Sequence, residues 1–420
     1  MLPAVSSPAA TPGTAMSPHR VRGLDGLRGF AALSVVLFHF RWRYAGGGYL
    51  TIDVFFALSG YLITNLLLAE RAKHGRIRLL RFWSRRMVRL WPPVAAGLLL
   101  AAAFAKDLSP DHTVHGFWRD ALSAGGWAMD ITTSLDPGHP RPLGYMWSLG
   151  IEEQFYLLWP LILVGAIAAG LRMRELSRLA ASLSAGSFVI FVLSWKNSAF
   201  LPAVYTRPDA RSFAILLGCS VAIYTADPRW PGSRLHRVIA HPVAGLAALA
   251  SVTAAFVLPG LIDPQLHLDP ALKIGAPLVA IVTVTLIAHI AARPTSPASR
   301  ILSFWPIAAI GTISYSLYLV HQPVVDTVYL HHFNDLPHTG NGLLLTQVGI
   351  SFAAALVLWA LVERPARLLS QRIGPTVAPA RRRPAHVPPR RWALVPLIGA
   401  VPILLVLAGT SMAVVWHHGP

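Results

Sequence analysis

The stretch RGFAALSVVLFHF, residues 28–40, is an apolar run of the kind found in membrane-spanning helices, yet it contains two polar side chains. Arg28 begins the run and His39 stands near its end. A charged side chain at the centre of a bilayer costs about 3 kcal/mol even on the lowest scales, so such residues generally face protein or water. We therefore expect Arg28 and His39 to have a function.

The composition indicates an integral membrane protein. Of the 420 residues, 54% are hydrophobic and 13% are charged, whereas roughly 25% are charged in an ordinary soluble domain. A single soluble core could not hold so much apolar surface. The net charge is +18, but the cationic residues gather in short segments between apolar runs, which is the pattern that orients helices in a membrane. We therefore expect these cationic residues to interact with the lipid bilayer, and we expect no nucleic acid as a partner.

The hydropathy pattern predicts eleven spans, at about 24–44, 48–69, 88–105, 146–170, 179–195, 211–226, 239–258, 273–292, 302–325, 343–362 and 393–416. Every second connection is rich in arginine: 71–89, 171–178, 227–237, 293–300 and 364–391. The alternate connections are richer in Asp, His and Pro. The positive-inside rule then predicts a multi-pass protein of the cytoplasmic (inner) membrane, with its N-terminus inside and its C-terminus outside.

Arg28 and His39 are predicted to share one face of the first helix. Positions eleven apart differ by three turns plus about 20°, and lie about 16 Å apart along the helix axis. Asp25 falls near the same stripe and can pair with Arg28 one turn away. The predicted topology places Arg28 near the cytoplasmic face and His39 in the outer half of the membrane.

Other predicted spans also contain polar residues, namely Asp53, Ser59, Glu152, Glu153, Tyr318 and His321. By the topology, the carboxylates and the two imidazoles lie at the same outer-half depth, which favours an acid–base cluster. A metal site is the rival interpretation, but no pair of these residues has the close helical spacing of a strong metal motif, so we expect no metal.

Several stretches together resemble the membrane acyltransferase 3 family, which O-acylates sugars, cell-surface polysaccharides and some natural products. They run in family order over about residues 24–365: LDGLRGFAALSVVLFHF (24–40), IDVFFALSGYLIT (52–64), RRMVRLWP (85–92), WSLGIEEQFYLLWP (147–160), DAR with Gly218 (209–218), SYSLYLVHQP (314–323) and VERP (362–365).

The resemblance implies an all-α, polytopic membrane bundle of ten helices, here with one extra C-terminal span. The predicted parts are a disordered cytoplasmic tail (1–22), the ten-span core (23–365), a basic cytoplasmic linker (366–391) and an eleventh span with a short external tail (392–420). In some relatives an extra helix leads to an extracytoplasmic hydrolase-like domain that completes transfer. Either the bundle acylates its acceptor directly, or a separate extracytoplasmic transferase takes part.

The family also takes an acyl-CoA donor from the cytoplasm, and Arg28, His39, Arg86 and Arg89 match positions that it uses in its activity. Arginine forks match phosphate oxygens, so Arg28 together with Arg85, Arg86 and Arg89 suits the phosphates of coenzyme A. His39 is expected to act as general base on an acceptor hydroxyl or to carry the acyl group itself. Glu152 or Glu153 is expected to orient its imidazole. The supporting residues are expected to be Asp25, Asp53, Ser59, Trp147, Tyr156, Arg211, Tyr318 and His321.

We therefore predict an O-acyltransferase that moves an acyl group, expected to be acetyl, from acyl-CoA to a hydroxyl of a sugar, a cell-surface polysaccharide, or a glycosylated or macrolide natural product. No tightly bound cofactor is expected, because acyl-CoA is a substrate. A multi-span transporter of a small polar or lipid-linked substrate is the alternative, since many helices and intramembrane charges are also typical of that class.

Overall fold

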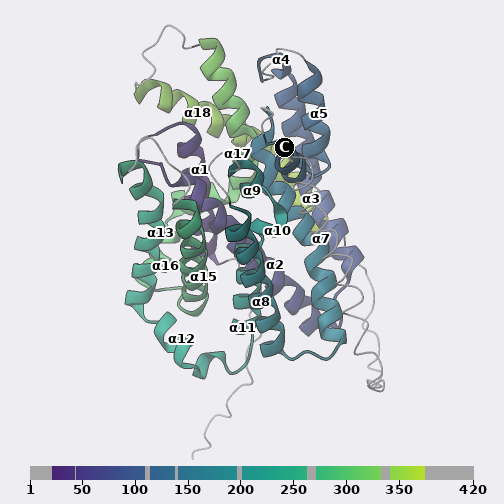
Figure 1. Ribbon diagram of the computed structural model, residues 1–420, viewed down its shortest axis with the longest axis vertical. Helices are drawn as coiled ribbons and strands as arrows, with labels where there is room; N and C mark the ends of the chain where they lie inside the picture. Colours follow the sequence, from purple (N-terminus) through teal and green to yellow (C-terminus); the bar gives the residue numbers. More distant parts are fainter. Residues whose placement is uncertain are drawn as a thin grey trace, which may run out of the picture.

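In the computed structural model of the protein, the described residues form helices that run side by side (Figure 1). The structure describes residues 21–42, 44–108, 114–137, 141–195, 201–262, 271–332 and 341–373. Within these ranges 86% of the residues are helical and none forms a strand. The predicted fold class, an all-α polytopic membrane bundle, is confirmed.

The first half of the described chain contains α1 (Arg22–His39), η1 (Gly48–Thr51), α2 (Ile52–His74), α3 (Leu79–Ala102), α4 (Ala105–Leu108), α5 (Val114–Gly125), α6 (Met129–Leu135), η2 (Gly144–Met146), α7 (Trp147–Ala168) and α8 (Met173–Ser194). The second half contains α9 (Leu201–Tyr205), α10 (Pro208–Arg211), α11 (Phe213–Thr225), η4 (Trp230–Gly232), α12 (Arg234–Ile239), α13 (Pro242–Ile262), η5 (Ala271–Gly275), α15 (Ala276–Ala292), α16 (Pro297–Leu302), α17 (Trp305–His332), α18 (Asn341–Leu358), η6 (Trp359–Glu363) and α19 (Arg364–Arg372).

Each of the first ten predicted spans coincides with one helix of this series, and the eleventh lies outside the described residues. Six helical segments among the described residues are long and apolar enough to cross a membrane: Gly48–His74, Gly144–Ala168, Met173–Ser194, Pro242–Ile262, Leu272–Ala292 and Leu344–Arg372. The α12 connection lies at one end of the bundle, and α4 and α5 lie at the other (Figure 1). This placement agrees with the alternation of the predicted connections.

The basic stretch 71–89 was predicted to be a connection between spans, but most of it is helical. Helix α2 continues to His74, and α3 begins at Leu79. The turn between them centres on Gly75, whose φ of 71° is the left-handed conformation that commonly ends a helix. Leucine and arginine are good helix formers, so the arginines beyond the turn form the first turns of α3 and have fixed positions on it.

Helices α1 and α17 run side by side and make the most extensive contact of the helix pairs in the described chain (Figure 1). One glycine on each helix allows the two backbones to approach. A Cβ atom at Gly29 of α1 would lie 2.0 Å from the carbonyl oxygen of Ile307 on α17. From the other helix, Gly311 approaches the carbonyl of Asp25 in the same way. Gly26 makes a similar approach to the helix before α17, since its Cβ would lie 1.6 Å from the carbonyl oxygen of Leu302, the last residue of α16. Small residues at such contacts are the usual basis of tight helix association in membranes.

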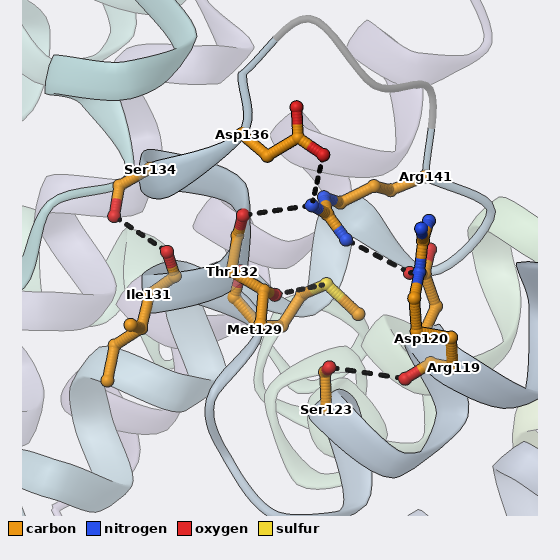
Figure 2. Close-up of polar contacts among 9 residues, drawn as sticks. All are labelled: Arg119, Asp120, Ser123, Met129, Ile131, Thr132, Ser134, Asp136 and Arg141. Carbon is orange, nitrogen blue, oxygen red and sulfur yellow. Dashed lines mark hydrogen bonds and ion pairs between the residues drawn. The ribbon is translucent and has the colours of Figure 1, made fainter. Parts of the chain in front are cut away.

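One arginine ties together the short helices between α3 and α7 (Figure 2). Nη1 of Arg141 donates to the buried carboxylate of Asp120 on α5 at 3.2 Å. Its Nη2 donates to the carbonyl of Thr132 on α6 at 2.9 Å and to Asp136 at 3.3 Å. Because Arg141 stands just before η2 and α7, these hydrogen bonds hold the segment that leads into α7 against α5 and α6.

A second buried carboxylate in the same region, Asp130, receives hydrogen bonds but no cation. Its two oxygens accept from Nε2 of Gln154 at 2.9 and 3.1 Å, and no Lys, Arg or His side chain forms an ion pair with it among the residues described. Asp130 lies on α6, outside the membrane-length segments. Burial raises its pKa to about 7, against a smaller opposing effect of its hydrogen bonds.

We expect the Gly29→Ala variant to be destabilised, because its methyl group would force α1 away from the carbonyl of Ile307. Overpacking of this kind costs about 1–3 kcal/mol, which lowers the melting temperature of the purified protein in detergent. The control is Gly186→Ala on α8, where a Cβ would meet no atom within 4 Å. Equal melting temperatures for the two variants would contradict the close approach of α1 and α17.

We expect stability to fall as the pH rises from about 4 to about 8, because Asp130 must then ionise while buried. The folded-state pKa is raised above the unfolded value, so its stabilising contribution is complete below about pH 4 and is lost as the pH passes through about 7. The loss is on the order of 4 kcal/mol. Asp130→Asn should flatten the melting temperature across this range and raise it at pH 8. Asp136→Asn, an exposed control on the same segment, should keep the wild-type pH dependence.

Candidate active site

Two histidines from the tightly packed helices meet at one level of the bundle. Nδ1 of His39, the last residue of α1, lies 3.3 Å from Nε2 of His321 on α17, and the ring centroids are 5.0 Å apart. His321 is completely buried, whereas His39 is half-buried. The structure therefore brings together the two imidazoles that the sequence placed at a common depth.

A contact with the backbone determines which ring nitrogen of His39 carries hydrogen. Its Nδ1 lies 2.9 Å from the carbonyl oxygen of Val35, one turn earlier. A carbonyl only accepts, so Nδ1 carries hydrogen and Nε2 of the neutral ring holds a lone pair. Nε2 has no hydrogen-bond partner within the described part of the chain. This nitrogen can take a proton from a substrate.

A second group of charges lies at the level of Arg28. Nη2 of Arg86 on α3 forms an ion pair of 3.2 Å with Glu153, and its guanidinium carbon stands 3.3 Å from the centroid of the Tyr156 ring. Glu152 accepts a hydrogen bond from the Tyr156 hydroxyl at 3.0 Å and interacts electrostatically with Arg28. Helices α1, α3 and α7 thus converge on one charged cluster, which we call the arginine cluster.

The arginine cluster also contains Glu363 and Arg367, which the sequence analysis did not propose as functional residues. Glu363 ends the π-helix η6, accepts from Ser316 at 2.7 Å and pairs with Arg367 at 2.6 Å. Arg89 interacts electrostatically with Glu363 and with three guanidiniums, those of Arg28, Arg86 and Arg367. The motif VERP contains Glu363 and was one available signal, but nothing in the local pattern showed that it faces α3.

Two guanidiniums of the arginine cluster are unpaired. Arg28 and Arg89 make no hydrogen bond and no ion pair within 4 Å with any residue that the structure describes. Arg85 is also partly exposed on α3. The guanidiniums of Arg28 and Arg89 repel each other, and neither has a direct ion pair to a carboxylate among the described residues. A bound polyanion would relieve that repulsion.

Aromatic and hydroxyl groups fill the space between the arginine cluster and the histidines. Tyr318 donates to the carbonyl of Tyr145, and Ser148 lies 2.9 Å from the Tyr318 hydroxyl. A cavity of about 10 Å³, the size of one water molecule, is enclosed by Ala32, Val35, Val36, Phe55, Ser314, Tyr318 and His321. The cavity lies along α1 between the levels of Arg28 and His39.

Neither Glu152 nor Glu153 contacts the imidazole of His39 among the described residues, in contrast to the expectation that one of them orients it. Glu152 and Glu153 belong to the arginine cluster, because Arg86 reaches Glu153 and Arg28 lies near Glu152. The partners of His39 are the Val35 carbonyl and His321. The sequence placed the residues correctly on their helices, but it could not show how far the arginine side chains extend along the bundle.

Asp53 and Arg211 form a separate ion pair with N–O distances of 3.1 Å, and both side chains are fully buried. Arg211 also lies over the ring of Tyr205, 4.7 Å from its centroid, and Trp147 packs on the same ring at 4.8 Å. This pair links α2 to α10 beside the site but does not contact the histidines. Ser59 hydrogen-bonds Tyr156, and Asp25 lies half-buried in the first turn of α1.

No group of three or more His, Cys, Asp or Glu side chains within the described ranges has the geometry to hold a metal ion. His289, which is also fully buried, has both ring nitrogens occupied, by the carbonyl of Ile239 at 2.6 Å and by Ser296 at 2.7 Å. It is a satisfied core histidine. Nε2 of His39, by contrast, has no hydrogen-bond partner among the described residues.

Comparison with known proteins gives a consistent result. The acyltransferase domain family matches residues 21–364. The chain is 32% identical to peptidoglycan O-acetyltransferase OatA of Listeria monocytogenes over 365 residues, which cover 84% of this chain and 57% of that protein. It is 34% identical to the putative peptidoglycan O-acetyltransferase YrhL of Bacillus subtilis, over 73% of this chain and 49% of that protein.

The O-acetyltransferase OatA of Staphylococcus aureus is 33% identical over 325 residues, which are 74% of this chain and 51% of that protein. This chain therefore spans about half the length of the curated relatives that it matches. No solved structure matches it.

We expect the Arg86→Leu variant to be destabilised by about 3–5 kcal/mol, because it leaves the buried Glu153 carboxylate without its ion-pair partner. The double variant Arg86→Leu/Glu153→Leu should recover most of that loss, as measured by thermal unfolding in detergent. As a control, Arg174→Leu breaks a more exposed pair with Asp227 and should cost at most about 1 kcal/mol. Additive losses in the double variant would show that the pair has no structural role.

Proposed function

Because this chain belongs to the acyltransferase 3 family, we propose that it is a membrane O-acyltransferase that moves an acetyl group from acetyl-CoA to a hydroxyl of a cell-wall polysaccharide. The proposal rests on one observation: two side chains on helix α1 have polar groups without a hydrogen-bond partner among the described residues. Arg28 contributes an unpaired guanidinium, and His39 contributes a free Nε2 about 16 Å away along the helix axis.

The arginine cluster suits the donor. Coenzyme A carries a pyrophosphate and a ribose phosphate, and guanidinium forks bind such oxygens in pairs. Arg28 and Arg89 donate to no residue that the structure describes, and Arg85 stands one turn before Arg89 on α3. Arg86 is held by Glu153, so we assign it to shaping the cluster as well as to attracting the anion.

His39 suits the chemical step. In the proposed reaction, the acceptor oxygen attacks the thioester carbonyl while Nε2 of His39 takes the hydroxyl proton. The carbon–sulfur bond then breaks, and the proton passes from Nε2 to the leaving thiolate. The products are an O-acetyl ester and free coenzyme A, and the histidine is regenerated. The phosphate-binding arginines lie at the other end of the α1 face, which leaves the acyl end of the donor nearer to His39.

We propose that the arginine cluster faces the cytoplasm of a bacterium and that His39 lies toward the outer leaflet of the inner membrane. The arginine-rich connections, which include 227–237, support this orientation. The relatives named as peptidoglycan O-acetyltransferases support a cell-wall polysaccharide as the acceptor. A separate extracytoplasmic transferase would be an additional partner if the bundle passes the group on.

The test is acetyl transfer by purified full-length protein from radiolabelled acetyl-CoA to peptidoglycan fragments. His39→Ala should lower kcat by about 10²- to 10⁴-fold, because it removes the general base. Arg89→Gln should raise the KM for acetyl-CoA by about 10- to 100-fold, because it removes a charged hydrogen-bond donor to phosphate.

Two exposed residues serve as controls, and Arg178→Gln and His241→Ala should leave both constants at their wild-type values. If His39→Ala retains the wild-type kcat, His39 is not the base. If the wild type transfers no acetyl group to any acceptor but moves a substrate across vesicle membranes, the protein is a transporter and the proposal is wrong.

A further inference from the structure

His321 is the side chain nearest to the proposed base, and its own environment is fully determined. Its Nδ1 lies 2.8 Å from the carbonyl oxygen of Tyr318, one turn earlier on α17. The rings of Tyr145 and Tyr318 pack against it at centroid distances of 5.6 and 5.8 Å. With no exposed surface, the imidazole of His321 cannot change its orientation without displacing these neighbours.

These contacts fix the protons on both rings. Nδ1 of His321 faces a carbonyl, so it carries hydrogen, and Nε2 of the neutral ring is an acceptor. That acceptor lies 3.3 Å from Nδ1 of His39, which also carries hydrogen because it faces the Val35 carbonyl. The Nδ1–H of His39 therefore has two acceptors, one from its own helix and one from α17.

We propose that His321 is a positioning residue for His39. Its Nε2 accepts a hydrogen bond from Nδ1–H of His39, keeps Nε2 of His39 unprotonated and directed away from α17, and stabilises the imidazolium that forms when His39 takes the hydroxyl proton. The inference rests on the proposed function, since it assigns a role within the same reaction.

His321 does not change its protonation in this scheme. The hydroxyl proton goes to Nε2 of His39 and then to the thiolate, while Nδ1–H of His39 stays in place throughout. The hydrogen bond to His321 strengthens when His39 becomes positive, because a charged donor makes a stronger bond than a neutral one. It therefore stabilises the charged intermediate more than the resting state, which is what lowers a barrier.

A carboxylate orients the imidazole in the better-known serine hydrolase arrangement. Here the second partner is a neutral ring, and the surroundings explain why. His321 is enclosed by Val35, Val36 and the two tyrosines, and an ionised carboxylate buried there would cost several kcal/mol. The nearest carboxylate on α17 is Asp326, which hydrogen-bonds Gln322 at 2.9 Å and faces Tyr145. A neutral acceptor gives orientation without that cost.

The test compares two substitutions of similar size and shape, His321→Gln and His321→Met. Glutamine has a carbonyl that can accept from His39 and an amide that can donate to the Tyr318 carbonyl, whereas methionine lacks both strong groups. In the acetyl-transfer assay, His321→Met should lower kcat about 10- to 100-fold, the effect of losing one hydrogen bond to a charged group. Its KM for acetyl-CoA should stay within about twofold, because the arginine cluster is intact. His321→Gln should recover most of the lost kcat.

A double-mutant cycle makes the test independent of overall stability. With His39→Ala already present, His321→Met should lower the residual rate no further, because the residue acts only through His39. His289→Gln is the control for a buried histidine. It should lower the melting temperature and leave kcat unchanged, because the ring nitrogens of His289 hydrogen-bond to Ile239 and Ser296 and not to His39.

The outcomes separate the two proposals. If the wild type transfers acetyl groups and His39→Ala does not, but His321→Met keeps the wild-type kcat, the role of His321 is refuted and the proposed function stands. Equal losses in His321→Gln and His321→Met would likewise refute it, by showing that packing and not the hydrogen bond matters. If the wild type transfers no acetyl group, both proposals fail.

Discussion

The close approach of α1 and α17 is the constraint on which the site depends. Backbone contacts at Gly29 and Gly311 set the distance and register of the two helices. The same helices carry His39 and His321, ten residues beyond Gly29 and Gly311 respectively. Since both helices are rigid over this length, the glycine contacts at one level determine that the two imidazoles meet at another.

Charge compensation is the second constraint, and it explains the composition of the arginine cluster. Glu153 and Glu363 neutralise Arg86 and Arg367 by direct ion pairs, and Glu152 interacts with Arg28. Three carboxylates thus accompany the guanidiniums of α1, α3 and α19. Without them, this concentration of positive charge in an apolar bundle would not be stable. Among the described residues the arrangement still leaves the guanidiniums of Arg28 and Arg89 without hydrogen-bond partners, and these would bind the phosphates of the proposed donor.

The Asp53–Arg211 ion pair and the hydrogen bonds of Arg141 show how the rest of the fold supports the site. The first fastens α2 to α10 beneath Tyr205 and Trp147. The second fixes the chain that leads into η2 and α7. Tyr145 lies on that chain and packs on His321. Side chains distant from the histidines therefore help to determine their geometry.

The sequence by itself determined the class of fold, the places of the first ten helices and the shared face of Arg28 and His39, because hydropathy and helical periodicity are local properties. Only the tertiary structure decided which polar groups meet. It moved Glu152 and Glu153 from the imidazole to the arginine cluster, added Glu363 and Arg367 to that cluster, and gave His39 a histidine as its side-chain partner. The physical reason is that long side chains reach across and along helices, so their partners depend on interhelical distance and register, which no single segment encodes.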